Sequence, residues 1–252
     1  MQVCGHIVVG KFHHCRLHKA VNTKQDRMKI NVLKIYSSRF DKQIAFYSGK
    51  IGLKLIEKTE YEAIFQIGKS KLIFKKSERF KPYHFAINIP ANKENEALNW
   101  LKQRVEILRD GNYEIQNFDS WNARAIYFYD EDKNIVEFIA RKNLKNENQG
   151  KFDSDSLLEI SEIGVSVNDI KPIYNSLTKI VNIQKYDGGL ERFCALGDEN
   201  GLFICINKNI KDWFPTGDKA YSSEFEIDFQ ENGKDYKLEF KNEQIKAVAN
   251  TV

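Results

Sequence analysis

The stretch YFYDEDKNIVEFIA, residues 127–140, decides how the rest of the chain is interpreted. It consists of an apolar strand, a polar turn and a second apolar strand with one carboxylate, Glu137, in its middle. A lone carboxylate buried in a strand costs roughly several kcal/mol unless a cation or a hydrogen-bond donor meets it. His84 is the only histidine after residue 18, and it lies in a second apolar strand, YHFAINI. Two ionisable groups on two apolar strands predict one shared polar site.

The composition is that of a globular protein. The chain has 252 residues, of which 42% are hydrophobic and 29% charged. No apolar run approaches the ~20 residues that a membrane span needs, and no secretory h-region is visible. We therefore expect a cytoplasmic protein with no membrane partner.

The net charge of +4 is confined to the start of the chain. Residues 1–27 contain five Lys or Arg against one acid, so the remaining residues balance to zero. The basic isoelectric point is then poor support for nucleic-acid binding, and we expect none. The same segment holds Cys4, Cys15 and four of the five histidines, in spacings that fit no regular zinc scheme. We expect a disordered or non-native extension.

The body of the chain repeats a unit of strand, helix and three strands. Two such units fill residues 28–143, and a polar linker follows at 144–156. A third unit with an added Asn-Gly hairpin fills 157–252. This pattern predicts an α+β fold of tandem βαβββ repeats, in which mixed sheets form ligand-enclosing cups with helices outside. Cys194 and Cys205 fall in predicted strands, and we expect buried thiols.

The helices are expected from apolar periodicity and from glycine stops. They cover RFDKQIAFYSGKIG, NKENEALNWLKQRVEIL and DIKPIYNSLTKIV. In the opening strand of the second unit, His84 shares a face with Ala86 and Asn88, because strand residues alternate between faces. Glu162 in the third unit likewise shares its face with Gly164 and Ser166. One face of these strands is therefore apolar, and the other is small, polar or charged, as in a cup.

Three stretches resemble the vicinal oxygen chelate superfamily, which includes glyoxalase I, extradiol dioxygenases, and fosfomycin and bleomycin resistance proteins. They are FYSGKIGLKLI (46–56), YHFAINIP (83–90) and YFYDEDKNIVEFIA (127–140). The resemblance covers residues 30–141 well and 158–206 more weakly. It implies that paired units enclose a cup within residues 28–143 of a glyoxalase-like domain, with 157–252 as a degenerate second domain.

The resemblance also implies a divalent metal, such as Fe, Mn, Ni or Zn. By motif position, His84 matches the opening-strand ligand and Glu137 the closing-strand ligand. The third ligand would normally come from the first unit, where this sequence has Ile30. Glu162, Tyr36 or Tyr129 is then the alternative third ligand. A structural interpretation also stays open, in which His84 pairs with Glu137, or Lys34 neutralises that carboxylate.

Aromatic and cationic side chains near the Glu137 turn are candidates for binding the substrate. They are Trp121, Arg124, Tyr127 and Tyr129, with Lys34 added as a cup-facing lysine. Strand tyrosines that merely pack well are the structural alternative.

Two functions follow from the sequence. In the first, a metal-dependent lyase or ring-cleaving dioxygenase acts on a small organic substrate, with Glu137 doubling as a catalytic proton acceptor. In the second, a non-catalytic protein of the same fold binds a drug or metabolite. A homodimer is left open, and so is a role for residues 158–252 as a lid or dimer surface.

Overall fold

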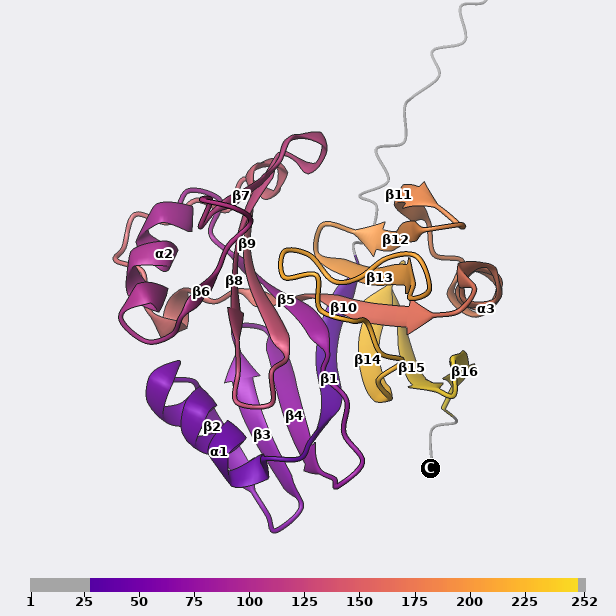
Figure 1. The fold of residues 1–252 in the computed structure, drawn as a ribbon, viewed down its shortest axis with the longest axis horizontal. Coiled ribbons are helices and arrows are strands. Elements are labelled where there is room, and N and C mark those ends of the chain that lie inside the picture. Colours follow the sequence, from indigo (N-terminus) through magenta and orange to yellow (C-terminus); the bar gives the residue numbers. More distant parts are fainter. Residues whose placement is uncertain (1–27, 249–252) are drawn as a thin grey trace, which may run out of the picture.

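The computed structural model describes residues 28–248, so the prediction made for residues 1–27 lies outside the described residues. Four successive groups of elements follow one another along the chain (Figure 1). The first comprises β1 (Lys29–Ser37), α1 (Phe40–Ala45) with a π-helical turn (Phe46–Lys50), β2 (Lys54–Lys58), β3 (Glu62–Ile67) and β4 (Ser70–Lys76). The second comprises β5 (His84–Ile89), α2 (Glu94–Lys102), β6 (Ile107–Leu108), β7 (Gln116–Phe118), β8 (Ala123–Tyr129) and β9 (Ile135–Arg141).

The second half repeats the pattern and then loses its helix. The third group comprises β10 (Glu159–Val167), α3 (Ile170–Val181), β11 (Lys185–Gly189), β12 (Phe193–Asp198) and β13 (Gly201–Asn207). The fourth keeps only β14 (Phe225–Glu231), β15 (Lys234–Lys241) and β16 (Gln244–Ala247). Asn232 and Gly233 both have positive φ, 51° and 72°, which confirms the expected Asn-Gly hairpin.

One predicted helix is too long. The expected helix ran to residue 108, but α2 ends at Lys102 and residues 107–108 form β6. Ile107 pairs with Phe128 of β8, so backbone bonds of the sheet replace those of the helix at this end.

The strands form two mixed sheets, which confirms the expected fold class. The first has seven strands in the order β16-β15-β14-β1-β4-β3-β2. The second has nine strands; eight follow the order β11-β12-β13-β10-β5-β9-β8-β6, and β7 pairs with β8. In each sheet two opening strands pair antiparallel, β1 with β14 and β5 with β10.

This pairing corrects the expectation that the first two units share one cup. The second unit shares its sheet with the third, and the first unit shares its sheet with the C-terminal hairpin (Figure 1). The edge of an opening strand is free to pair with any other opening strand, and the sequence pattern does not choose the partner. The division of the chain into domains at 144–156 stays a prediction.

A continuous apolar core joins the two sheets and the helices. Phe203 of β13 packs edge-to-face on Phe229 of β14, with ring centroids 5.5 Å apart, and so links one sheet to the other. Phe46 of the first unit stacks on Phe128 of the second at 6.4 Å. Cys194 and Cys205 are buried and unbridged, as expected. Among the helices between residues 28 and 248, none combines the length and apolar character that a bilayer span requires.

Candidate metal centre

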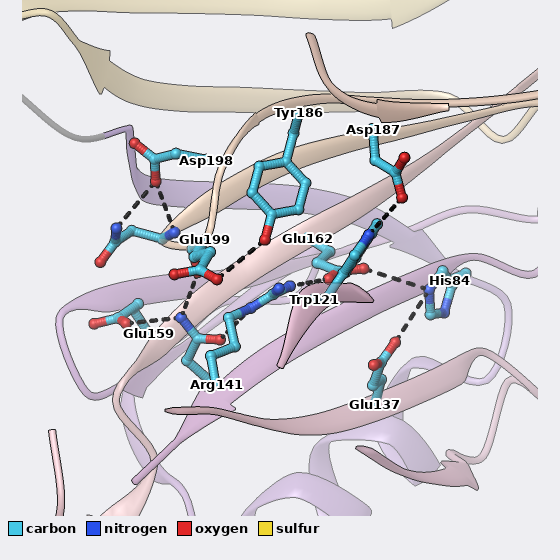
Figure 2. Close-up of polar contacts among 12 residues, drawn as sticks. His84, Trp121, Glu137, Arg141, Glu159, Glu162, Tyr186, Asp187, Asp198 and Glu199 are labelled. Atoms are coloured by element: carbon cyan, nitrogen blue, oxygen red, sulfur yellow. Dashed lines mark hydrogen bonds and ion pairs between the residues drawn. The ribbon is translucent and has the colours of Figure 1, made fainter. Parts of the chain in front are cut away.

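Three ligand-type side chains converge in the nine-stranded sheet. His84 comes from β5, Glu137 from β9 and Glu162 from β10, so the second unit supplies two groups and the third supplies one. One potential ligand atom from each lies within 4.8 Å of the others, and all three side chains are buried. Figure 2 shows His84 between the two carboxylates: Nε2 is 3.5 Å from Oε2 of Glu137 and 4.0 Å from Oε2 of Glu162.

Strand geometry explains why these groups meet. The neighbouring strands β5 and β9 run parallel, with Ala86 opposite Glu137, and β10 pairs with β5 on its other edge. A β-bulge between Ile160 and Glu162 shifts the register of β10. A bulge changes which face the following residues occupy, and here it leaves Glu162 on the side of His84.

The imidazole of His84 is set up as a neutral ligand. Its Nδ1 lies 3.2 Å from the carbonyl oxygen of Ile135. A carbonyl can only accept, so Nδ1 carries the hydrogen and Nε2 keeps a free lone pair toward the carboxylates. Burial lowers the pKa of His84 from 6.5 to about 4. The ring is therefore uncharged near neutral pH, which is the form that binds metals.

The surroundings of the two carboxyl groups favour their protonated, uncharged form. Burial, followed by the charge of Glu162, raises the pKa of Glu137 well above its ordinary 4.5. Burial also raises the pKa of Glu162, although the Arg141 guanidinium opposes that rise. Two buried carboxylates this close repel one another unless a proton or a cation lies between them. The donor set, one neutral imidazole and two carboxylates, fits a divalent cation.

The site has further neighbours on β8 and β9. Tyr127 is the cross-strand partner of Glu137, and burial followed by the charge of that carboxylate raises the pKa of its hydroxyl well above the usual range. Arg141 Nη2 donates to Glu162 Oε1, while its Nε donates to Asn88 Oδ1 at 3.2 Å. The contact with Arg141 orients Glu162 through the oxygen that faces away from His84.

A loop between β13 and β14 covers the centre. Trp213 stacks obliquely on His84, with ring centroids 5.0 Å apart, and Phe214 packs edge-to-face on Tyr127 at 5.7 Å. Gly164 leaves the room for this, because a Cβ at that position would lie 2.7 Å from the Trp213 ring. The Tyr129 hydroxyl donates to Asp218 of the same loop. The cup is therefore closed over the three ligand-type groups.

The interior of the cup is an apolar cluster separate from the main core. It combines small residues on the sheet with aromatic rings at the rim and in the covering loop. The small residues include Ala86, Ala125 and Ala195, and the rings include Phe118, Trp121, Tyr127, Tyr186, Phe193, Trp213 and Phe214. These side chains pack together between the sheet and the covering loop.

Two predicted site residues lie elsewhere. Lys34 belongs to the seven-stranded sheet, where it pairs with Glu62 at 3.5 Å and Glu226 at 3.6 Å, so it does not neutralise Glu137. Arg124 points away from the cup because it alternates with Ala123 and Ala125, and its guanidinium meets Glu94 at 3.3 Å.

The tyrosines proposed as third ligands also lie apart from the triad. Tyr36 is in β1 of the other sheet, and Tyr129 is engaged with Asp218 at the rim. Trp121, by contrast, is at the rim of the cup, where its indole nitrogen donates to Asp187 at 2.6 Å (Figure 2). Ile30, at the position where the superfamily has a ligand, is turned into the main core by a bulge in β1.

Arg141, Asn88 and Trp213 were not among the predicted site residues. For Arg141 a signal existed, since it lies four residues after Glu137 and strand alternation places both on one face. Trp213 lies in a loop, where no periodicity indicates what a side chain covers.

Two surface hollows differ in their distance from the triad. One of about 1130 Å³ is lined by residues such as Tyr36, Arg79 and Lys241. A smaller one of about 190 Å³ is lined by Ile135 of β9 and by Trp213 and Asp218 of the covering loop, among others. Because Ile135 accepts from His84, this smaller hollow borders the centre.

Comparison with solved structures identifies the fold. No protein-family model matches the chain, and no curated protein matches it in sequence. A candidate dioxygenase from Bacillus subtilis subsp. subtilis str. 168 is similar over 84% of this chain and 85% of its own, with a TM-score of 0.56 and 12% identity. Glyoxalase I from Zea mays covers 71% of this chain and 66% of its own, with a TM-score of 0.50 and 16% identity.

A V278E variant of the same Zea mays enzyme covers 84% of this chain and 91% of its own, at a TM-score of 0.51 and 14% identity. The chain therefore has the fold of the vicinal oxygen chelate superfamily, as the resemblance implied. At these identities the likeness establishes the fold alone, because this fold hosts many activities.

Proposed function

We propose that the protein is a metal-dependent enzyme of the vicinal oxygen chelate type that acts on a small organic substrate in the closed cup. The observation that carries the proposal is the convergence of His84, Glu137 and Glu162 from three strands and two repeat units. Three protein ligands leave open positions on a metal, as catalytic sites require. Lyase or ring-cleaving dioxygenase chemistry is the reaction class.

The residues of the chain have separate tasks in this proposal. A bound divalent ion would supply Lewis acidity to two oxygens of the substrate. Glu137, close to Tyr127 and the imidazole, is the group that accepts a proton from the substrate. Trp213 and Phe214 exclude water above the site. Arg141 and Asn88 hold Glu162 and its surroundings in place.

Metal binding is the direct test. We expect purified protein, dialysed after exposure to Zn²⁺ or Mn²⁺, to retain about one ion per chain and to unfold at a higher temperature. His84→Ala and Glu162→Gln should each lose that ion and the stabilisation, because each leaves only two ligands. Elemental analysis and thermal unfolding with and without a chelator measure both effects.

A matched control is available in the other sheet. Glu231 is a buried glutamate of β14 whose pKa burial raises to about 7, so Glu231→Gln removes a similar group far from the triad. The control should bind metal as the wild type does. Wild-type protein that retains no ion, or that loses it equally in the control, contradicts the proposal.

A second candidate function is a non-catalytic binder of a small molecule. One observation favours it: without metal, a proton on Glu137 and the pairing of Glu162 with Arg141 already neutralise the site. The binder predicts that an apolar ligand raises the unfolding temperature equally with and without a chelator. The enzyme predicts that the chelator abolishes part of that rise.

A further inference from the structure

Three lysines line a surface hollow to which the metal triad does not contribute. Its volume is about 460 Å³, within the range of about 300–1,000 Å³ that small-molecule sites occupy. Lys208 and Lys219 of the covering loop line it, and Lys81 joins them from the segment between β4 and β5. Among the described residues, no carboxylate lines this hollow; its other walls are Asn209, Ala220, Tyr221 and Ser222. This lysine hollow is therefore a candidate site for an anion.

Lys208 is held in position and keeps one hydrogen for a ligand. Its Nζ donates to Oε1 of Glu243 at 2.5 Å and to Oγ of Ser222 at 2.9 Å, and an ammonium carries three hydrogens. Glu243 also accepts from the backbone and side-chain N–H groups of Asn168, at 2.8 to 3.0 Å. That carboxylate is therefore well satisfied, and it lines the neighbouring hollow and not this one.

Lys81 and Lys219 are exposed and have no acidic partner among the described residues. Lys81 Nζ lies 5.4 Å from the centroid of the Tyr221 ring, and the attraction between cation and ring positions the ammonium. Neither lysine donates a hydrogen bond to another residue between 28 and 248. Their N–H groups are therefore available to an acceptor in the lysine hollow.

Two further hollows adjoin the lysine hollow and share its walls. The hollow of about 1130 Å³ shares Lys81, Lys208 and Ser222 with it, and the hollow of about 190 Å³ shares Lys219 and Tyr221. A ligand anchored on the lysines therefore has space for the remainder of its structure.

The charged side chains that line the three hollows have a positive excess. The cations are Arg79, Lys81, Lys133, Lys208, Lys219 and Lys241, and the carboxylates are Glu78, Asp218, Glu224 and Glu243. Two of these carboxylates besides Glu243 have partners: Glu224 pairs with Lys241 at 3.2 Å, and Asp218 accepts from Tyr129. The excess of two positive charges matches a phosphate monoester, which carries about −1.5 to −2 at pH 7.

We propose that the lysine hollow binds a phosphate group, carried by a small phosphorylated compound or present as free phosphate. Lys81, Lys208 and Lys219 supply point charges and N–H donors to its oxygens. The site is separate from the metal triad, so the proposal goes beyond the proposed function. Because Lys208 and Lys219 belong to the covering loop and Lys81 does not, the anion bridges two segments of the chain.

Glucose 6-phosphate and glucose are the probes, because they share the sugar and differ by the phosphate. Isothermal titration into metal-free wild-type protein at low salt, where exposed charges are least screened, should show glucose 6-phosphate binding at least about tenfold tighter than glucose. No binding of glucose 6-phosphate at millimolar concentration, or equal affinities for the two sugars, overturns the proposal.

Inorganic phosphate distinguishes the two sources of the anion. Affinity equal to that of glucose 6-phosphate assigns the site to free phosphate. Weaker binding of inorganic phosphate assigns it to a phosphorylated compound whose body occupies the adjoining space.

Exposed lysines can be replaced without disturbing the core, so the variants test binding and not folding. Lys81→Gln and Lys219→Gln should each weaken glucose 6-phosphate binding at least about threefold, and the double variant at least about tenfold. Lys54→Gln, which removes an exposed lysine of β2 in the other sheet, is the matched control and should bind as the wild type does. Unchanged affinity in the double variant, or equal weakening in Lys54→Gln, contradicts the proposal.

The outcomes separate this proposal from the proposed function, because the titration uses metal-free protein. If Zn²⁺ does not bind but the lysine-dependent affinity for glucose 6-phosphate is present, the metal enzyme fails and the phosphate site stands. If Zn²⁺ binds at the triad but wild-type protein does not discriminate between the two sugars, only the phosphate site fails.

Discussion

Glu137 is a buried carboxyl group whose neighbours act on its protonation in opposite directions. Burial and the neighbouring Glu162 favour its protonated form, whereas Arg141 and Tyr127 favour its charged form. The first two influences are larger, so its pKa in the folded chain lies above that in the unfolded chain. A metal would reverse this balance by replacing the proton. Proton release on metal binding is therefore expected.

A pH-dependent stability follows for the metal-free protein. Because folding raises the pKa of Glu137, the stability linked to its proton is present at low pH and is lost as the pH rises through the folded-state pKa. His84 acts in the opposite sense: its pKa falls to about 4, so stability is lost as the pH drops below 6.5. Glu137→Gln should flatten the alkaline loss, and urea unfolding in the presence of a chelator at several pH values measures it.

The exposed Glu57 of β2 supplies the control for this experiment. Glu57→Gln should reproduce the wild-type pH profile. The same alkaline slope in Glu137→Gln and in the wild type would show that Glu137 is not the titrating group.

At the scale of elements, the turn between β8 and β9 holds two units together. Asp130 at its start is buried and accepts hydrogen bonds from Gln43 and Tyr47 of the first unit, and from Asn134 of its own turn. Asp132 accepts from Ser37 at the end of β1. The acidic turn in the stretch 127–140 therefore links the helix of the first unit to β9, the strand that carries Glu137.

The covering loop packs over the centre through Trp213. Trp213→Ala removes the ring above His84 and Gly164, and loss of a buried Trp costs about 3–5 kcal/mol. We expect this variant to release bound metal to a chelator faster than the wild type. Stopped-flow measurements with a coloured chelator follow the release.

Trp213→Phe keeps a ring over the imidazole and should release metal at close to the wild-type rate. Trp100→Ala, whose ring packs on Phe138 and Phe152 in the main core, is the control for lost stability. Equal release from Trp213→Ala and Trp100→Ala would mean that the loop does not gate the site.

At the scale of the whole molecule, the halves of the sequence are interleaved. β14 completes the sheet of the first unit, and β10 completes the sheet of the second, so neither sheet is complete within residues 28–143. Glu162 comes from the later half as well. The chain beyond the linker is therefore part of the cup. The homodimer left open by the sequence stays a prediction.

A chain that ends at Gln149 should not behave as a smaller functional protein. It would expose the apolar faces and the edges of β1 and β5, and it would lack Glu162. We expect it to associate or aggregate and to bind no metal tightly. Size-exclusion chromatography with light scattering, and metal analysis, measure both properties. A monomeric truncated chain with wild-type metal content would contradict the interleaved arrangement.

Local pattern predicted the elements and much of the site. Strand alternation placed His84 and Glu162 on the polar face of their strands, and the buried Glu137 identified β9 as a site strand. The same alternation places Arg141 on the face of β9 that carries Glu137, although Arg141 was not predicted as a site residue. Strand alternation was also the basis for placing Lys34 in the cup, but its strand, β1, belongs to the other sheet.

Alone, the sequence determined which residues alternate and where strands turn, and it placed His84 and Glu137 in apolar strands and Glu162 on the polar face of another strand. Those properties depend on neighbours a few residues apart, which the chain order contains. Only the tertiary structure decided that β5 pairs with β10 and not with β1, that a bulge turns Ile30 inward, and that Trp213 closes the cup. These depend on pairings between segments far apart in the chain, which no local periodicity encodes.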